Sequence, residues 1–122
     1  MNFIKKRVLS FKYAFNGIFY FIKSQHNAWI HIVAAFFAIV FGFIFNISVT
    51  EWCIIIIIIS LVLSAEAFNT AIEKIVDLVS PEYNKLAGII KDVSAGAVLI
   101  LAIAAALTGI IIFLPKFLII IT

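Results

Sequence analysis

The sequence predicts an all-α membrane protein, with one helix on the membrane surface followed by three transmembrane helices. The first observation is composition, because 66% of the 122 residues are hydrophobic and only 12% are charged. A soluble domain of this length could not hide so much apolar surface, so lipid must be the solvent for much of the chain. The second observation is that long stretches contain no charged residue, and the third is that no linker interrupts them. We therefore expect a single membrane domain over residues 1–122.

Gaps in the charge pattern locate the three spans. The long stretches without Asp, Glu, Lys or Arg each approach the roughly 20 apolar residues that a helix needs to cross a bilayer. The second stretch leads into a span that carries one glutamate, Glu66, and the third ends at Leu114 because Pro115 follows. The expected spans cover about residues 29–45, 52–72 and 93–114.

The basic residues predict the orientation of these spans. Five of them precede the first span, and Lys85 and Lys91 lie between the second and the third. The loop after the first span has only Glu51, and the C-terminal tail has only Lys116. Because positively charged residues stay on the cytoplasmic side, we expect the N-terminus and the second loop to lie in the cytoplasm. The chain is then expected in the inner (cytoplasmic) membrane of the cell.

The segment before the first span, about residues 3–24, predicts an amphipathic helix in the membrane interface. Apolar residues recur there at spacings of three and four, which places them on one stripe of a helix: Ile4, Val8, Phe11, Phe15, Ile18 and Ile22. Lys6, Tyr13 and Tyr20 fall on the far side. Such a helix lies with its apolar face in the lipid. The simplest interpretation is that this helix only anchors the chain to anionic lipid.

A strip of polar residues continues through the second span. Glu66, Asn69, Glu73 and Asp77 occur at i, i+3, i+7 and i+11, so a helix gathers them within about 80° over a rise of about 16 Å. A buried carboxylate in a span costs several kcal/mol unless it is paired or faces a polar cavity. The strip suits a reaction that joins a lipid head group to a water-soluble, metal-bound compound. The alternative is that these groups only bond to neighbouring helices and to water.

The start of the third span supplies a complementary charge. Lys91 and Asp92 stand where a cation could meet a phosphate and an acid could orient it, although a lysine that only extends to the interface is the simpler interpretation. Small residues follow and favour close helix packing in a bundle or oligomer. No Walker-type glycine loop and no His or Cys metal cluster is present. His26 and His31 are expected to be interfacial or packing residues rather than ligands.

The segment EAFNTAIEKIVDLVSPEYNKLAGIIKDVSAGAVLI, residues 66–100, resembles the prokaryotic diacylglycerol kinase family, which includes undecaprenol kinases. The stretches FKYAFNGI, NAWIHI and IFLPK resemble the form of the family whose substrate is undecaprenol. The resemblance covers nearly the whole chain. It implies a homotrimer with active sites between subunits, which transfers a phosphoryl group from ATP to the hydroxyl of a membrane lipid, either diacylglycerol or undecaprenol.

The resemblance also implies roles for individual residues. Glu66 falls where the family has its catalytic carboxylate, with Asn69 ordering the site beside it, and Glu73 falls on a glutamate that binds Mg²⁺. The positions that match the nucleotide region of the family are Lys6, Tyr13, Asp77, Glu82, Tyr83, Asn84, Lys91 and Asp92. Such a reaction depends on positioning and charge neutralisation more than on covalent chemistry.

One position departs from the family. Many relatives have a glutamate of the magnesium site near the end of the surface helix, where this chain has Gln25. An amide oxygen can still bind Mg²⁺ but carries no charge, so we expect weaker metal binding with the chemistry retained. Alternatively Gln25 binds only water, or the chain is a weak, degenerate kinase.

Two other functions remain possible on the residues alone. A small transporter also carries a membrane glutamate but would not need Glu73, Asp77 and Lys91 at one membrane face. A non-catalytic membrane subunit would explain the small residues but not the acidic strip. We therefore expect a lipid kinase that uses Mg²⁺, ATP and a lipid alcohol at the cytoplasmic face, with no nucleic-acid partner.

Overall fold

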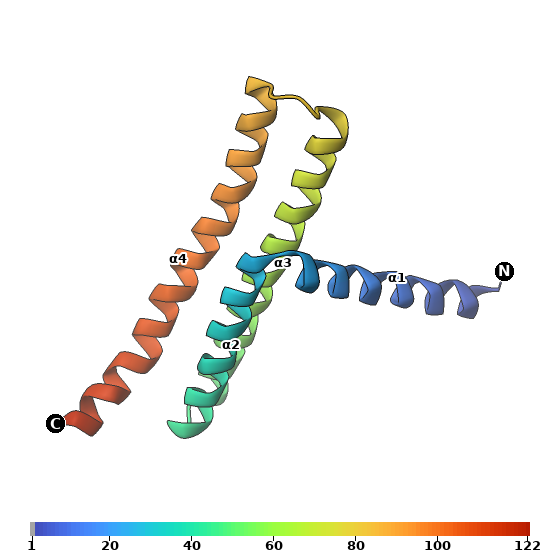
Figure 1. Cartoon of the computed structure of the whole chain (residues 1–122). Coiled ribbons are helices and arrows are strands. Elements are labelled where there is room, and N and C mark those ends of the chain that lie inside the picture. Colours follow the sequence, from blue (N-terminus) through green and yellow to red (C-terminus); the bar gives the residue numbers. More distant parts are fainter. Residues whose placement is uncertain (1) are drawn as a thin grey trace.

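The computed structural model describes residues 2–122 and, within them, contains only helices: α1 (Phe3–Ser24), α2 (His26–Ile44), α3 (Val49–Val79) and α4 (Lys85–Ile121). Helices α2, α3 and α4 form an elongated bundle, and α1 leaves it at a steep angle (Figure 1). The last three helices are each long and apolar enough to cross a membrane. The predicted all-α architecture with three candidate spans is thus confirmed.

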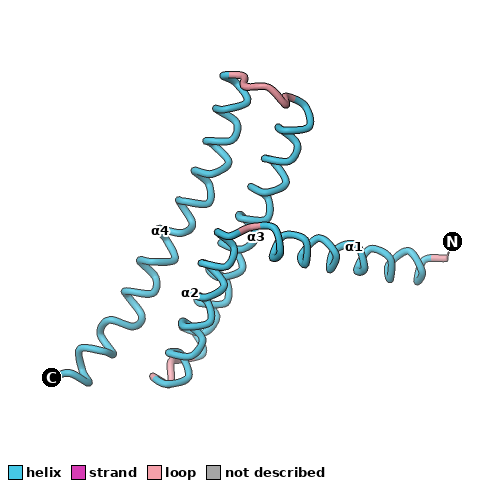
Figure 2. The backbone as a smooth tube through the Cα atoms, viewed as in Figure 1, coloured by secondary structure: helices cyan, strands magenta, loops and turns pink. Residues whose placement is uncertain are grey.

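Polar side chains cap the N-termini of several helices. The side chain of Asn2 accepts a hydrogen bond from the backbone N–H of Lys5 at 2.8 Å, and Asn84 caps the first turn of α4 in the same way. A single residue, Gln25, separates α1 from α2, and its extended backbone redirects the chain between them (Figure 2). This break lets α1 lie across the bundle while α2 runs along it.

The best-packed part of the bundle lies where α2 turns into α3 beside the end of α4. Its buried centre comprises Ile47, Ile55, Ile112 and Phe113. Asn46 makes the turn possible by adopting a left-handed backbone with φ of 51°, a conformation that asparagine tolerates. Gly42 is required there, because a Cβ at this position would lie 2.6 Å from the ring of Trp52.

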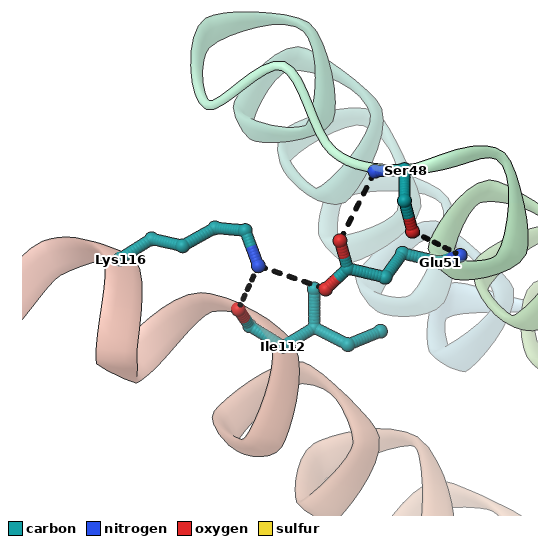
Figure 3. Close-up of polar contacts among 4 residues, drawn as sticks. All are labelled: Ser48, Glu51, Ile112 and Lys116. Carbon is teal, nitrogen blue, oxygen red and sulfur yellow. Dashed lines mark hydrogen bonds and ion pairs between the residues drawn. The ribbon is translucent and has the colours of Figure 1, made fainter.

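A polar clasp closes the same end of the bundle (Figure 3). We use this name for Ser48, Glu51, Lys116 and the carbonyl of Ile112. Ser48 and Glu51 form a capping box on α3, and Lys116 Nζ donates to Glu51 Oε2 at 2.8 Å and to the Ile112 carbonyl at 2.9 Å. The hydrogen bond from Lys116, followed by that from the Ser48 N–H, lowers the pKa of the Glu51 carboxyl.

Helix α4 continues through Pro115 to Ile121, beyond Leu114, where the sequence places the end of the third span. Proline removes one backbone hydrogen bond from a helix and crowds the carbonyl four residues earlier. The clasp holds the turn around Pro115 against α3, because Lys116 bonds to both helices. The helix is therefore longer than its expected membrane-spanning part.

Most of the outer surface of the bundle is apolar. Large side chains such as Ile56 and Ile57 on α3 and Ile100 and Ile103 on α4 are more than half exposed. The apolar residues of the stripe on α1 are exposed as well, apart from the half-buried Ile22. Helix α3 packs most extensively against α4 and less against α2. A surface of this kind requires lipid or further protein around it.

Candidate active site

The polar strip of the sequence lies on the part of α3 that leads to the 80–84 loop. This loop and the adjoining ends of α3 and α4 extend beyond the level at which α1 leaves the bundle (Figure 1). The second half of α1 runs past α3 near Thr70, and residues of both helices line one shallow pocket there. The strip therefore begins at the level of α1 and continues toward the loop.

Glu66 lies in the middle of α3 with only 5% of its surface exposed. Its Oε1 atom is 3.0 Å from Nε2 of His31, which α2 contributes. One turn further along, the Thr70 hydroxyl donates to the main-chain carbonyl of Glu66 and is itself buried. A buried carboxylate needs such a hydrogen-bonded partner, because an unpaired charge in an apolar interior is strongly destabilising.

Asn69 and Glu73 form the next pair along the strip. The amide Nδ2 of Asn69 donates to Glu73 Oε1 at 3.3 Å, whereas the amide oxygen of Asn69 is buried and has no partner among residues 2–122. On α4, the hydroxyl of Ser94 is likewise buried without a partner in this part of the chain. Buried polar atoms are rarely left unsatisfied, so these two mark a place where a ligand or water is expected.

Near the loop, an ion pair joins α3 to α4. Lys91 Nζ donates to Asp77 Oδ1 at 2.6 Å, and both side chains are substantially exposed. This hydrogen bond raises the pKa of the Lys91 ammonium, and the charges of Asp77 and Glu73 act in the same direction. Lys91 therefore keeps its positive charge beside the acidic strip. Its ammonium could leave the Asp77 carboxylate and bind a phosphate group instead.

The oxygen atoms of Asn69 and Glu73 suit a hard cation such as Mg²⁺, which prefers carboxylate and carbonyl ligands. The unpaired amide oxygen of Asn69 is the observation that favours such a ligand. No group of three His, Cys, Asp or Glu side chains that could hold a metal ion is found among residues 2–122 of one chain. These residues therefore fit Mg²⁺ as part of a site that phosphate oxygens or further groups would have to complete.

An apolar groove leads away from the His31–Glu66 pair, between α2, α3 and α4. Its volume is about 370 Å³, and small residues of α2 and α4, among them Ala34, Ala38 and Ala102, widen it. His31 is one of its few polar lining residues. The groove therefore gives an apolar chain a path along the bundle to the buried carboxylate.

Comparison with known proteins shows the family of this chain. The family model described as "Prokaryotic diacylglycerol kinase" matches residues 12–113. The chain belongs to the prokaryotic diacylglycerol kinase family. It is 37% identical over 115 residues to the undecaprenol kinase of Bacillus subtilis (strain 168), covering 94% of each chain.

Two further relatives are named diacylglycerol kinase. The one from Synechocystis sp. is 37% identical over 112 residues, which is 91% of this chain and 64% of that protein. The one from Escherichia coli (strain K12) is 32% identical over 102 residues, which is 78% of this chain and 84% of that protein. The family resemblance expected from the sequence is confirmed, and the chain is a membrane lipid kinase rather than a transporter or a non-catalytic subunit.

The fold of this kinase brings together only some of the residues that the resemblance implies. Lys6 and Tyr13 lie on the exposed first half of α1, which projects away from the bundle (Figure 1). Gln25 is partly buried at the break between α1 and α2. No hydrogen bond or ion pair joins any of these three to the polar strip within residues 2–122.

The α3–α4 loop and the start of α4 follow the strip, but the side chains of their implied site residues are exposed. Tyr83 is 91% exposed, and the side chains of Glu82 and Asp92 are exposed as well. Asn84 has a structural task, because its side-chain oxygen accepts the N–H groups of Leu86 and Ala87. Among the positions that match the nucleotide region of the family, and within residues 2–122, only Asp77 and Lys91 form a side-chain hydrogen bond with each other.

The sequence does not predict the contact of His31 with Glu66, because its pattern favours an interfacial or packing role for His31. The two residues lie 35 positions apart and on different helices, so no local spacing relates them. One signal was available, because an ionisable residue inside a transmembrane span is a candidate functional residue by default. His31 lies within the span expected over residues 29–45.

Proposed function

We propose that this lipid kinase transfers the γ-phosphoryl group of ATP to the hydroxyl of undecaprenol, producing undecaprenyl phosphate at the cytoplasmic face of the inner membrane. The observation that carries the proposal is the buried, hydrogen-bonded carboxylate of Glu66. It shares one helix with Asp77, whose ion pair with Lys91 lies about 16 Å further toward the loop. A lipid hydroxyl could approach the strip at Glu66, while a triphosphate bound near Lys91 would extend along the strip toward it.

In this proposal Glu66 accepts the proton of the lipid hydroxyl while the hydroxyl oxygen attacks the γ-phosphorus, and the bond from that phosphorus to the bridging oxygen breaks to release ADP. A positioned base of this kind typically contributes about 10²–10⁴-fold to a rate. Asn69 orders the groups around the acceptor, and Lys91 and Asp92 bind and orient the phosphates. Glu73 and Gln25 would hold Mg²⁺, with the unpaired amide oxygen of Asn69 available beside Glu73, and the ion when bound neutralises charge on the phosphate oxygens. Lys6, Tyr13, Asp77, Glu82, Tyr83 and Asn84 complete the nucleotide site.

Undecaprenol is preferred over diacylglycerol as the acceptor because the relative from Bacillus subtilis matches over 94% of both chains and carries that substrate in its name. Diacylglycerol remains the alternative, because two other relatives are named for it.

A homotrimer would complete the site. Two features support this proposal: Lys6 and Tyr13 lie away from the strip of their own chain, and no group of three candidate metal ligands is found within residues 2–122. The half-exposed isoleucine surfaces of α3 and α4 give subunits an apolar face on which to associate. In this assembly α1 of one subunit would cover the strip of another.

The orientation in the membrane follows from the charges at the two ends of the bundle. Lys85 and Lys91 lie near the α3–α4 loop, at the end toward which the strip runs, whereas Lys116 at the other end is paired with Glu51. Helix α1, with its apolar stripe exposed, would lie in the cytoplasmic interface. A cysteine introduced at position 48 that reacted only with a cytoplasmic reagent would contradict this topology.

The function is tested by incubating purified full-length protein in detergent–lipid micelles with γ-labelled ATP and either undecaprenol or diacylglycerol. We expect Mg²⁺-dependent label in the lipid fraction, with a higher kcat/KM for undecaprenol. Faster labelling of diacylglycerol would overturn the choice of acceptor. An absence of label in both lipids, with folded protein, would overturn the proposed reaction.

A further inference from the structure

We infer that His31 is a positioning residue for Glu66: its Nε2–H holds one carboxylate oxygen so that the other faces the acceptor hydroxyl. This inference rests on the proposed function, in which Glu66 is the base. The contact is direct, with 3.0 Å between His31 Nε2 and Glu66 Oε1, and it is the point at which α2 meets the polar strip of α3.

The chemistry of the two groups fixes the direction of this hydrogen bond. To act as the base, Glu66 must be ionised, and an ionised carboxylate can only accept, so in the proposed reaction the ring nitrogen 3.0 Å away carries the hydrogen. The bond occupies Oε1, and among residues 2–122 no hydrogen bond is found to Oε2. The second oxygen therefore stays available to take the proton of an approaching hydroxyl.

The surroundings of the pair make the hydrogen bond consequential. The Glu66 side chain is 6% exposed and that of His31 is 22% exposed, so little water competes for either group. In such an environment a hydrogen bond to a charged group is stronger than in water, and without it the carboxylate would be free to rotate. Phenylalanine at position 31 would fill the space without offering a donor.

His31 also borders the groove along which the acceptor would approach. Its ring is among the lining residues, whereas most of the others are aliphatic or aromatic. A lipid alcohol whose chain lay in this groove would bring its hydroxyl to the end where the imidazole holds the carboxylate. His31 therefore lies between the groove and the base, where it can align Glu66 with the hydroxyl of the substrate.

Two substitutions at this position separate positioning from packing. The amide nitrogen of glutamine reaches about as far from the backbone as Nε2 of histidine, so His31→Gln keeps a donor, while His31→Phe keeps the ring shape and removes it. We expect His31→Phe to lower kcat by about 10-fold to 100-fold, the range typical for the loss of a hydrogen bond that orients a functional side chain. His31→Gln should restore most of kcat, and the KM for ATP should be unchanged in both variants.

A matched control is available on the same helix. His26, the only other histidine, is exposed and lies about 140° around α2 from His31, so His26→Phe should leave kcat unchanged. The carboxylate itself provides a readout that does not depend on turnover. Because the chain has only six carboxylate side chains, the infrared band of Glu66 can be assigned by its loss in Glu66→Gln. This band should shift in His31→Phe and stay near its wild-type position in His31→Gln.

The inference is overturned if His31→Phe turns over lipid as fast as the wild type, because His31 would then only fill space. It is also overturned if the Glu66 band is the same in His31→Phe and in the wild type, whatever the rates. These results differ from failure of the proposed function, which would appear as a wild-type protein that phosphorylates neither undecaprenol nor diacylglycerol.

Discussion

Where α4 ends, Glu51 and Lys116 join α3 to α4, and near the opposite end Asp77 and Lys91 make an ion pair between the same two helices. The clasp is closed, because both oxygens of Glu51 and the ammonium of Lys116 have partners within the chain. The strip is open: its ion pair is exposed, and the buried amide oxygen of Asn69 has no partner among residues 2–122.

This difference teaches how one pair of helices divides its polar residues between stability and function. Polar groups that are satisfied within the chain can hold the fold, as the capping box and Lys116 do around Pro115. Polar groups that are buried and unsatisfied lower stability unless something binds them, so they mark a place that a ligand completes. Substitutions at the two ends should therefore affect different properties.

The largest effect is expected for the matched pair Glu66→Gln and Glu51→Gln. Glu66→Gln should lower kcat by about 10²-fold or more while ATP binding survives, because an amide keeps the shape but cannot accept the proton. Glu51→Gln should leave kcat unchanged and lower the melting temperature instead. Steady-state phosphorylation of lipid, ATP binding and thermal unfolding distinguish the two, and a Glu66→Gln variant with most of its activity would refute the assignment.

A smaller effect is expected for Lys91→Met, which removes the cation beside the strip. It should lower kcat/KM for ATP by about 10-fold to 100-fold through loss of a charged contact to phosphate, with little change in melting temperature because the ion pair with Asp77 is exposed. Lys74→Met, at an exposed lysine of α3, is the control. Equal losses in both variants would mean that general charge, and not a contact of Lys91, is responsible.

The stability contributed by the clasp should depend on pH. Glu51 has a folded-state pKa below its ordinary value of 4.5, so its stabilising contribution is complete above pH 4.5 and is lost as the pH falls through the lowered folded pKa. Wild type should therefore melt at a higher temperature than Lys116→Met at pH 7, and the difference should shrink below pH 4.5. A difference that stays constant down to pH 3 would exclude Glu51 as its source.

The smallest effect is expected at the position that departs from the family. Gln25→Glu should lower the Mg²⁺ concentration for half-maximal activity and change kcat less, because a carboxylate adds charge to a neutral ligand. The measurement is a magnesium titration of lipid phosphorylation at saturating ATP, beside Asn27→Asp as a control for added charge nearby. Identical titration curves for Gln25→Glu and wild type would place Gln25 outside the metal site.

The sequence predicted an all-helical chain with three candidate membrane spans because gaps in the charge pattern are a local property. It also predicted which face of α3 carries Glu66, Asn69, Glu73 and Asp77. It did not predict that α4 continues past Pro115, because the clasp that holds this turn joins Lys116 to Glu51, 65 positions earlier. Contacts of this kind depend on how helices pack and leave no signature within either segment.

The contact of His31 with Glu66 was missed for the same reason, since each residue by itself fits a simpler interpretation. The residues of α1 show the converse limit. The resemblance assigns Lys6 and Tyr13 to the nucleotide site, yet the first half of α1, which carries them, projects away from the bundle (Figure 1). Whether they meet a nucleotide depends on contacts between chains, and neither periodicity nor the fold of one chain determines these.

Hydrogen–deuterium exchange of the full-length protein, with and without Mg²⁺, ATP and undecaprenol, tests the division between the two ends most directly. The account predicts that the ligands slow exchange in residues 64–93, around Glu66 and the α3–α4 loop. It predicts no change around the clasp, in residues 45–52 and 114–121, whose polar groups are already satisfied. Protection that appeared at the clasp and not in residues 64–93 would contradict it.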